Sequence, residues 1–217
     1  MESSLNRYSI SEEIANSITH GIGILLAIVA FGTLTAFASI YGNIWHIISV
    51  SVYGVTLILL YTASTLYHSI QNPSTKNIFQ ALDHSSIYIL IAGTYTPFML
   101  VNLRGPWGWS LFAMIWCLAF FGAVVQFGKT MRWRGVSLIS YVVMGWAIIL
   151  AIKPLITSVA LGGIILLLIG GLSYTFGILF YRWEKLKFHH AVWHIFVLAG
   201  SALHFFAVLF YVIPIQS

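Results

Sequence analysis

The stretch THGIGILLAIVAFGTLTAFASIYGN, residues Thr19 to Asn43, contains no charged side chain. It belongs to a longer uncharged run from Ile14 to Thr75, which the turn-forming sequence YGN interrupts at residues 41–43. A membrane-spanning helix needs roughly 20 apolar residues, so this run predicts two spans joined by a short turn. The whole chain has the same character, since 59% of its 217 residues are hydrophobic and 7% are charged. A soluble domain has about 25% charged residues, and the composition therefore predicts an integral membrane protein.

Further apolar segments predict an all-α, seven-transmembrane helix bundle with short connections. There is no linker and no internal repeat, so residues 1–217 are expected to form a single domain that begins with a short cytoplasmic segment, residues 1–18. The sequence Lys153-Pro154 is expected to separate the fifth helix from the sixth. The predicted helices occupy residues 19–40, 44–70, 77–103, 107–127, 135–152, 158–181 and 189–213.

The basic side chains lie unevenly at the two ends of these helices. Because Lys and Arg are enriched in cytoplasmic loops, this bias predicts a cytoplasmic N-terminus and, with an odd number of spans, an external C-terminus. The formal charge of +5 is thereby explained by topology, and no basic patch suggests nucleic-acid binding. No cleavable signal peptide is evident, and the single cysteine excludes an intrachain disulfide. The N-terminal side carries Arg7, Lys76, Lys129, Arg132, Arg134, Arg182, Lys185 and Lys187, and the other side carries Arg104 and Lys153.

Several polar groups are expected at one depth near the cytoplasmic helix ends. His190 and His194 open the last predicted helix at positions i and i+4, so both side chains project from one face. An α-helix rises 1.5 Å per residue. All four polar residues therefore lie roughly 10 Å or less from the cytoplasmic ends of their helices: His190, His194, His68 and Asp83. Ser64 lies one turn from His68. Three neutral imidazoles and a water form a common catalytic zinc set, and a neighbouring carboxylate can hold that water or take its proton.

A simpler interpretation exists for each of these residues. A histidine pair at a helix end is weak evidence for a metal, because interfacial histidines also face lipid headgroups. A carboxylate inside the membrane is costly and usually functional, which favours the metal site. Among the remaining histidines, we expect His189 and His46 to face headgroups, His84 to pack near the site, and His204 to be a hydrogen-bonded core residue.

Four motifs, in the same order along the chain, carry a family resemblance. They are EEIANSITHGIG (Glu12 to Gly23), STLYH (Ser64 to His68), LDHSSIYILIAGTYTPF (Leu82 to Phe98) and HAVWHIFVLAGSALHFF (His190 to Phe206). Together they resemble the bacterial hemolysin III family over nearly the whole chain. That family belongs to a superfamily of seven-helix proteins with the progestin and adiponectin receptors and the alkaline ceramidases.

The resemblance implies a zinc ion, Zn²⁺, near the cytoplasmic helix ends, with His68, His190 and His194 as its ligands. By motif, Asp83 matches the acidic residue that holds the zinc-bound water, and Ser64 matches the motif serine. The receptor and ceramidase branches imply hydrolysis of ceramide-like lipid amides, whereas the name of the hemolysin III branch implies pore formation. The residues of the first motif, which we expect to close the cytoplasmic mouth, are Glu12, Glu13, Asn16 and His20.

The leading hypothesis is a zinc-dependent hydrolase of the bacterial inner membrane that acts on a lipid amide or ester. Asp83 would be the base or water holder, and Ser64 a supporting hydrogen-bond donor, with membrane lipids as the partners. Three alternatives stay open. They are a non-enzymatic sensor or regulator of lipid homeostasis with a structural zinc, a pore-forming cytolysin, and a b-type haem carrier, since paired histidines also ligate haem.

The orientation gives the first testable prediction. A phosphatase fused after Ser217 should be active outside the cytoplasm, because the basic residues place the opposite end of the bundle inside. Phosphatase activity of the expressed fusion measures this directly. A well-expressed but inactive fusion would refute the topology.

Overall fold

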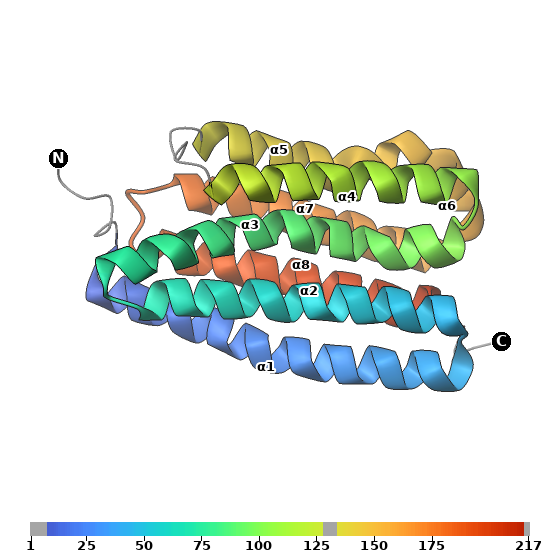
Figure 1. Ribbon diagram of the computed structural model, residues 1–217, viewed down its shortest axis with the longest axis horizontal. Coiled ribbons are helices and arrows are strands. Elements are labelled where there is room, and N and C mark those ends of the chain that lie inside the picture. The colour runs from blue at the N-terminus through green and yellow to red at the C-terminus, as the bar shows by residue number, and fades with distance from the viewer. Residues whose placement is uncertain (1–7, 128–133, 215–217) are drawn as a thin grey trace.

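The computed structural model describes residues 8–127 and 134–214. Within these ranges the chain forms seven long helical rods that run side by side (Figure 1). The rods are α1 (Ile10–Tyr41), α2 (Ile44–Ser69), α3 (Pro73–Pro97) extended by the π-helical turn η1 (Phe98–Asn102), α4 (Pro106–Phe127), α5 (Arg134–Trp146) continued through the 3₁₀ turn η3 (Ala147–Ala151) into α6 (Ile152–Ser158), α7 (Leu161–Arg182) and α8 (His189–Tyr211).

The outside of the bundle suits lipid. In the described ranges, six rods are long and apolar enough to cross a membrane: α1, α2, α4, the rod from Val136 to Ser158, α7 and α8. Large apolar side chains such as Leu25 on α1 and Phe120 on α4 are exposed, which a water-soluble surface would not tolerate over so wide an area. The seventh rod, α3, carries polar side chains that are buried inside the bundle. The chain is therefore a polytopic membrane helical bundle, which confirms the predicted fold class.

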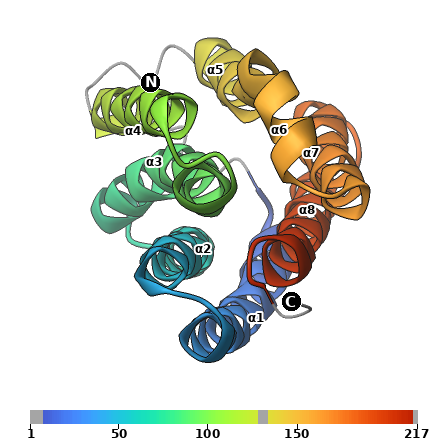
Figure 2. The same ribbon diagram turned by 90° about the vertical axis from the view of Figure 1, so that its right-hand side faces the viewer.

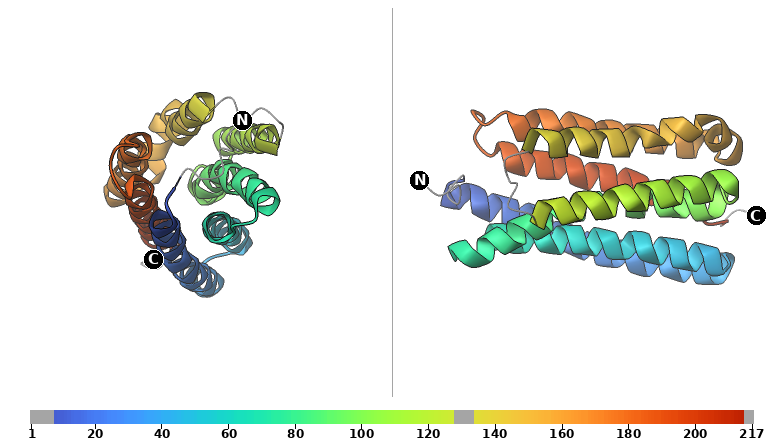
Figure 3. Two further views of the ribbon diagram at one scale, coloured as in Figure 1. Left: turned by 90° about the vertical axis from the view of Figure 1, so that its left-hand side faces the viewer. Right: turned by 45° about the horizontal axis from the view of Figure 1, so that its top comes forward.

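The rods follow one another around a ring. Seen end-on, α1 to α4 form one side of the ring and α5 to α8 the other, and α8 returns to lie beside α1 (Figures 2 and 3). The start of α1 and the end of α8 lie at opposite ends of the bundle, as an odd number of crossings requires (Figure 1). Which end faces the cytoplasm stays a prediction.

The first helix begins at Ile10, well before the predicted start near residue 19. Ser9 forms a capping box with Glu12: the Ser9 hydroxyl accepts from the Glu12 amide at 3.4 Å, and the Glu12 carboxylate accepts from the Ser9 amide at 2.9 Å. The cap places Glu12 and the polar residues that follow it on a regular helix. Residues 10–18, expected to precede the bundle, are thus part of it.

The fifth rod also differs from the sequence prediction. It continues through Lys153 and Pro154 to Ser158, and the connection to α7 lies at Val159 and Ala160 instead. Pro154 is tolerated because it falls in the first turn of α6, where its missing N–H has no intrahelical partner to lose.

The interruption of this rod upstream of Pro154 has a visible cause in α3. The Tyr95 hydroxyl donates to the Met144 carbonyl oxygen at 2.8 Å and accepts from the Ile148 amide at 2.9 Å. In an unbroken α-helix these two backbone groups would bond to each other. The inserted hydroxyl replaces that bond, and the backbone tightens into the 3₁₀ turn η3.

The packing of α1 on α2 yields a prediction with a matched control. A Cβ added at Gly23 would lie 2.6 Å from Cδ1 of the buried Tyr61 ring, whereas a Cβ at Gly32 on the same helix would have no neighbour within 4 Å. Gly23→Ala should lower the free energy of unfolding by about 1–3 kcal/mol, the usual cost of overpacking. Gly32→Ala should leave it unchanged or raise it by up to about 1 kcal/mol through helix propensity. Thermal unfolding in detergent compares the two, and equal effects would contradict this packing.

Candidate metal centre

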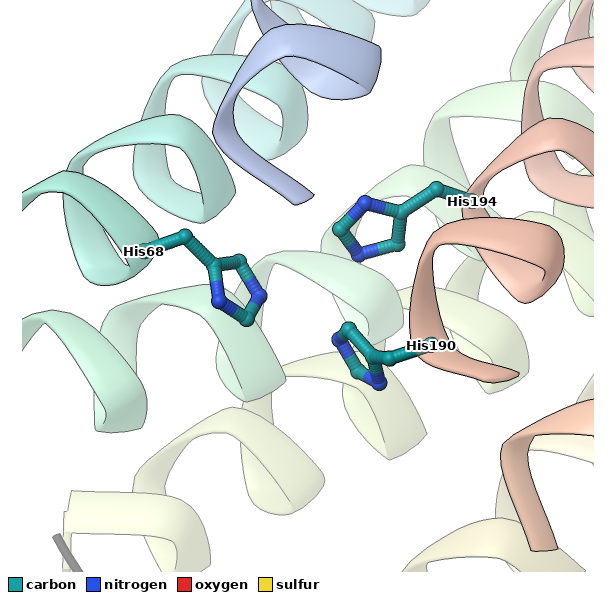
Figure 4. A group of neighbouring side chains, drawn as sticks. All are labelled: His68, His190 and His194. Atoms are coloured by element: carbon teal, nitrogen blue, oxygen red, sulfur yellow. The ribbon is translucent and has the colours of Figure 1, made fainter. Parts of the chain in front are cut away.

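Three histidines from two helices meet at the end of the bundle where α1 and α3 begin. His68 lies in the last turn of α2, and His190 and His194 lie one turn apart at the start of α8. Their rings point toward one another (Figure 4). One nitrogen from each ring falls within 4.8 Å of the other two, and each residue is at most 4% exposed. The i, i+4 spacing on α8 thus provides two imidazoles on one face, and α2 brings the third.

Glu13 fixes the protonation of His68. The His68 Nδ1 atom lies 2.6 Å from Glu13 Oε2, and because a carboxylate only accepts, Nδ1 carries the hydrogen. The lone pair is then on Nε2, which is buried and has no hydrogen-bond partner among the described residues. The other Glu13 oxygen accepts from Lys76 Nζ at 2.8 Å, and Lys76 also donates to the Tyr67 carbonyl oxygen at 3.1 Å. This buried ion pair joins α1, the end of α2 and the start of α3.

Thr19 has the same effect on His194. Its hydroxyl donates to the backbone carbonyl oxygens of Ala15 and Asn16, both at 2.9 Å. It must therefore accept from His194 Nδ1 at 3.0 Å, which places the His194 lone pair on Nε2. That Nε2 atom is also buried, without a hydrogen-bond partner in residues 8–127 and 134–214.

The start of α8 is held from α1 as well. Phe188, the residue before the helix, has a left-handed backbone with φ of 61°, which is unfavourable for an aromatic residue. Its amide donates to Glu12 Oε1 at 3.1 Å, and this bond supports the turn that directs His190 inward. Tyr8 adds a hydrogen bond between its hydroxyl and His190 Nδ1 at 3.0 Å.

This arrangement fits a bound metal ion. Metal-ligating histidines usually give one ring nitrogen to the ion and the other to a carboxylate, hydroxyl or carbonyl, as His68 and His194 do here. Three imidazole nitrogens are a common ligand set for zinc, although imidazole also suits other first-row metals. The buried triad could therefore hold a metal ion, and its donors alone do not choose which one.

Asp83 and Ser64, the proposed catalytic residues, lie next to this triad but outside it. Asp83 is buried on α3, and its carboxylate does not belong to the group of ligand atoms that lie within 4.8 Å of one another. Ser64 is fully buried one turn before His68 and neighbours the Asp83 carboxyl, although no hydrogen bond of good geometry joins the two. Their catalytic roles stay a prediction.

A cavity of about 130 Å³ lies inside the bundle, and its wall includes His20, whose ring stacks on His194. Asp83 and His20 lie on its wall near the triad, and Tyr95 lies about 18 Å further along α3 at 1.5 Å per residue. The wall between them is mostly apolar. The apolar lining includes Leu60, Ile87, Leu90, Ile91, Leu138, Val142, Ile178 and Val197.

Some of the residues singled out from the sequence are placed differently. Glu13, Asn16 and His20 are buried and contact the triad, and closure of the cytoplasmic mouth by the first motif stays a prediction. The His20 ring stacks on that of His194, with centroids 3.4 Å apart. These three residues occupy positions i, i+3 and i+7 of an apolar helix, a polar stripe that could have been recognised in the sequence. No sequence signal marks the hydroxyl of Thr19, which is one of several threonines on membrane helices.

Two other histidines were expected to face headgroups. For His189 this was wrong, because its ring is buried against the end of α7 and its Nδ1 donates to the Phe180 carbonyl oxygen at 3.2 Å. His46 lies at the opposite end of the bundle, where its Nδ1 accepts from the Asn43 amide at 3.1 Å and caps α2.

The sequence comparisons agree on one family. The family model described as "Haemolysin-III related" matches residues 8–205. "Hemolysin-3" of Bacillus cereus is 52% identical over 208 residues, which cover 96% of this chain and 95% of that protein. "Hemolysin-3 homolog" of Bacillus subtilis (strain 168) is 50% identical, covering 96% and 98%. More distantly, the human "Monocyte to macrophage differentiation factor" is 29% identical over 203 residues, covering 91% and 83%.

The contact between Glu13 and His68 can be tested by metal binding. Glu13→Gln keeps the size of the side chain but removes the charge that holds His68 Nδ1–H and pairs with Lys76. Metal affinity should fall about 10- to 100-fold, the usual effect of losing a group that orients a ligand. Competition with a chelator measures the affinity. His46→Ala, at the far end of the bundle, is the control and should bind metal as the wild type does; equal affinity of Glu13→Gln would refute this role.

Proposed function

Since this chain belongs to the Haemolysin-III related family, we propose that it is a zinc-dependent hydrolase that cleaves a lipid amide or ester within the membrane. The observation that carries the proposal is the convergence of three buried histidines, together with an apolar cavity whose wall includes the buried acid Asp83 and His20, the ring that stacks on His194. A purely structural metal would need neither the acid nor the cavity.

Zinc is the ion that we propose for the triad. His68 and His194 present neutral imidazoles with their Nε2 lone pairs inward, and His190 completes a three-histidine set. Zinc sites with three protein ligands typically leave a fourth position for water or substrate. When bound, zinc polarises a carbonyl oxygen and makes a water molecule more acidic at neutral pH.

Asp83 supplies the proton transfer in this proposal. Its carboxylate takes a proton from the attacking water as the oxygen of that water bonds to the substrate carbonyl carbon. The bond from that carbon to nitrogen, or to the ester oxygen, then breaks. Asp83 returns the proton to the leaving atom, which departs as an amine or an alcohol, and a carboxylic acid remains. Ser64 is buried and neighbours the Asp83 carboxyl, and in this proposal its hydroxyl would donate a hydrogen bond that orients the carboxylate during the reaction.

The substrate class follows from the surroundings of the acid. The cavity that Asp83 borders is walled mainly by apolar side chains, and it runs roughly 18 Å along α3 from Asp83 to Tyr95. An extended acyl chain fills such a space and removes its own apolar surface from contact with polar groups. The carbonyl of an amide or ester at the head of that chain would then lie beside the triad.

The relatives named Hemolysin-3 suggest a second candidate, a pore-forming protein. In this chain the bundle interior contains large buried side chains such as Tyr53, Tyr61 and Met99, which favour a packed core over a wide aqueous pore. Conductance across a pure lipid bilayer tests the alternative. Stable single-channel currents from the purified protein would favour the pore, and their absence together with lipid turnover would favour the hydrolase.

The enzyme is tested by two variants with different expected outcomes. Asp83→Asn keeps the shape of the side chain but removes the base, so zinc should stay near one per chain, while hydrolysis falls by about 10²–10⁴-fold. His194→Ala removes a ligand and should lose both zinc and activity. Zinc content and turnover of a lipid amide are measured in each variant.

The same pair separates the hydrolase from a sensor with a structural zinc. If Asp83→Asn loses zinc as completely as His194→Ala, Asp83 is a direct ligand and the fourth position is not open. A wild-type protein that holds zinc but hydrolyses no lipid amide or ester would favour the non-enzymatic sensor.

A further inference from the structure

His204 lies on the wall of the same cavity, far from the triad. It follows His194 on α8 and lies ~15 Å deeper at 1.5 Å per residue. Its Nε2 is 3.2 Å from the Leu167 carbonyl oxygen on α7, and because a carbonyl only accepts, Nε2 carries the hydrogen. Nδ1 is then an acceptor with no hydrogen to donate. This atom is buried, and no hydrogen-bond partner for it exists among the described residues.

The imidazole is held in this orientation by α7. A Cβ added at Gly170 would lie 2.5 Å from His204 Cδ2 and 2.6 Å from Nε2, so the backbone of α7 packs directly against that edge of the ring. The Tyr174 ring lies on another side, with centroids 5.5 Å apart. Turning the ring over would break the bond to Leu167. A simple rotation of the imidazole ring therefore cannot give Nδ1 a hydrogen-bond partner without losing another hydrogen bond.

Four hydroxyl groups on the cavity wall direct their hydrogens to the protein. Each of the hydroxyl groups concerned donates to a backbone carbonyl oxygen, which leaves only lone pairs for a ligand. These bonds run from Thr94 to Leu90 (2.9 Å), from Tyr95 to Met144 (2.8 Å), from Tyr141 to His84 (2.9 Å) and from Thr175 to Gly171 (2.8 Å). His20, on the wall beside His194, also has ring nitrogens without a partner among the described residues. Deeper in the cavity these hydroxyl groups offer a ligand acceptors, and there His204 Nδ1 is a buried acceptor with an unmade bond.

We propose that the cavity selects lipids whose acyl chain carries a hydroxyl group near its middle, and that His204 Nδ1 accepts the hydrogen bond from it. This inference rests on the proposed function, because the depth is counted from a carbonyl held beside the triad. A chain hydroxyl has a hydrogen to give, whereas a ketone at the same carbon has none. An unmade hydrogen bond at a buried acceptor is costly, so the ligand that forms it gains affinity.

The test is competition binding to the zinc-loaded protein in nanodiscs. The probes are stearoyl amides that are unsubstituted, hydroxylated at mid-chain, oxidised to a ketone at that same carbon, or hydroxylated beside the carbonyl. The mid-chain hydroxyl should tighten binding about 3- to 10-fold, the value of one hydrogen bond, and the other two substituents should give no gain.

Three variants assign the effect to His204. His204→Leu should abolish the gain, and His204→Gln, which keeps an oxygen acceptor, should retain part of it. Tyr174→Phe is the control: it lies on the same wall, but its hydroxyl bonds to Ser201, so the gain should persist. Zinc content reports whether each variant is folded. Should His204→Leu fail to fold, the Gln variant and the ketone comparison in the wild type still decide.

Two results separate this inference from the proposed function. If the wild type binds and hydrolyses all the amides alike, or the gain survives in folded His204→Leu, the hydroxyl selection is wrong and the hydrolase stands. If the zinc-loaded wild type neither binds nor hydrolyses any of them, the hydrolase itself is wrong, and the inference falls with it.

Discussion

The carboxylate of Glu13 connects α1, α2 and α3 beside the candidate metal centre. It accepts from His68 on α2 and from Lys76 on α3, and it comes from α1. Such a group is stable away from water only while both partners remain, because a lone buried charge is strongly unfavourable. Lys76 extends the connection by holding the Tyr67 carbonyl oxygen at the end of α2. The position and protonation of His68, and with them one wall of the metal centre, follow from this ion pair.

The polar groups of α3 show how a membrane helix can carry a reactive acid. Lys76, Gln80 and Asp83 occupy positions i, i+4 and i+7, and all three are buried on one face. Lys76 pairs with Glu13, and Gln80 donates to the Tyr67 hydroxyl at 3.0 Å. Asp83, the deepest of the three, instead borders the cavity. The stripe therefore ends where a carboxylate meets an apolar space, which is the position that the proposed function requires of its acid.

Part of this architecture could be predicted from the sequence. The uncharged runs and the short breaks predict the bundle, and the i, i+4 pair on α8 at the depth of His68 predicts the meeting of three imidazoles. Contacts between helices could not be predicted in this way. The insertion of Tyr95 into the fifth rod, the burial of His189 against α7 and the tautomer that Thr19 imposes on His194 depend on which side chains meet across the bundle. Hydrophobic periodicity carries no information about such meetings.

Tyr8, Glu13 and Thr19 all bond to Nδ1 atoms of the triad, and all three come from the first stretch of the described chain. An ion held by the triad would therefore bind the same imidazoles that this stretch contacts, each through its other ring nitrogen. Binding energies that share a partner in this way are thermodynamically linked, and the linkage is reciprocal. If a metal binds, the contacts from the N-terminal part of α1 would raise the affinity for it, and the bound metal would strengthen these contacts by the same factor. The order of the N-terminal helix would then depend on metal occupancy as much as the metal depends on the helix.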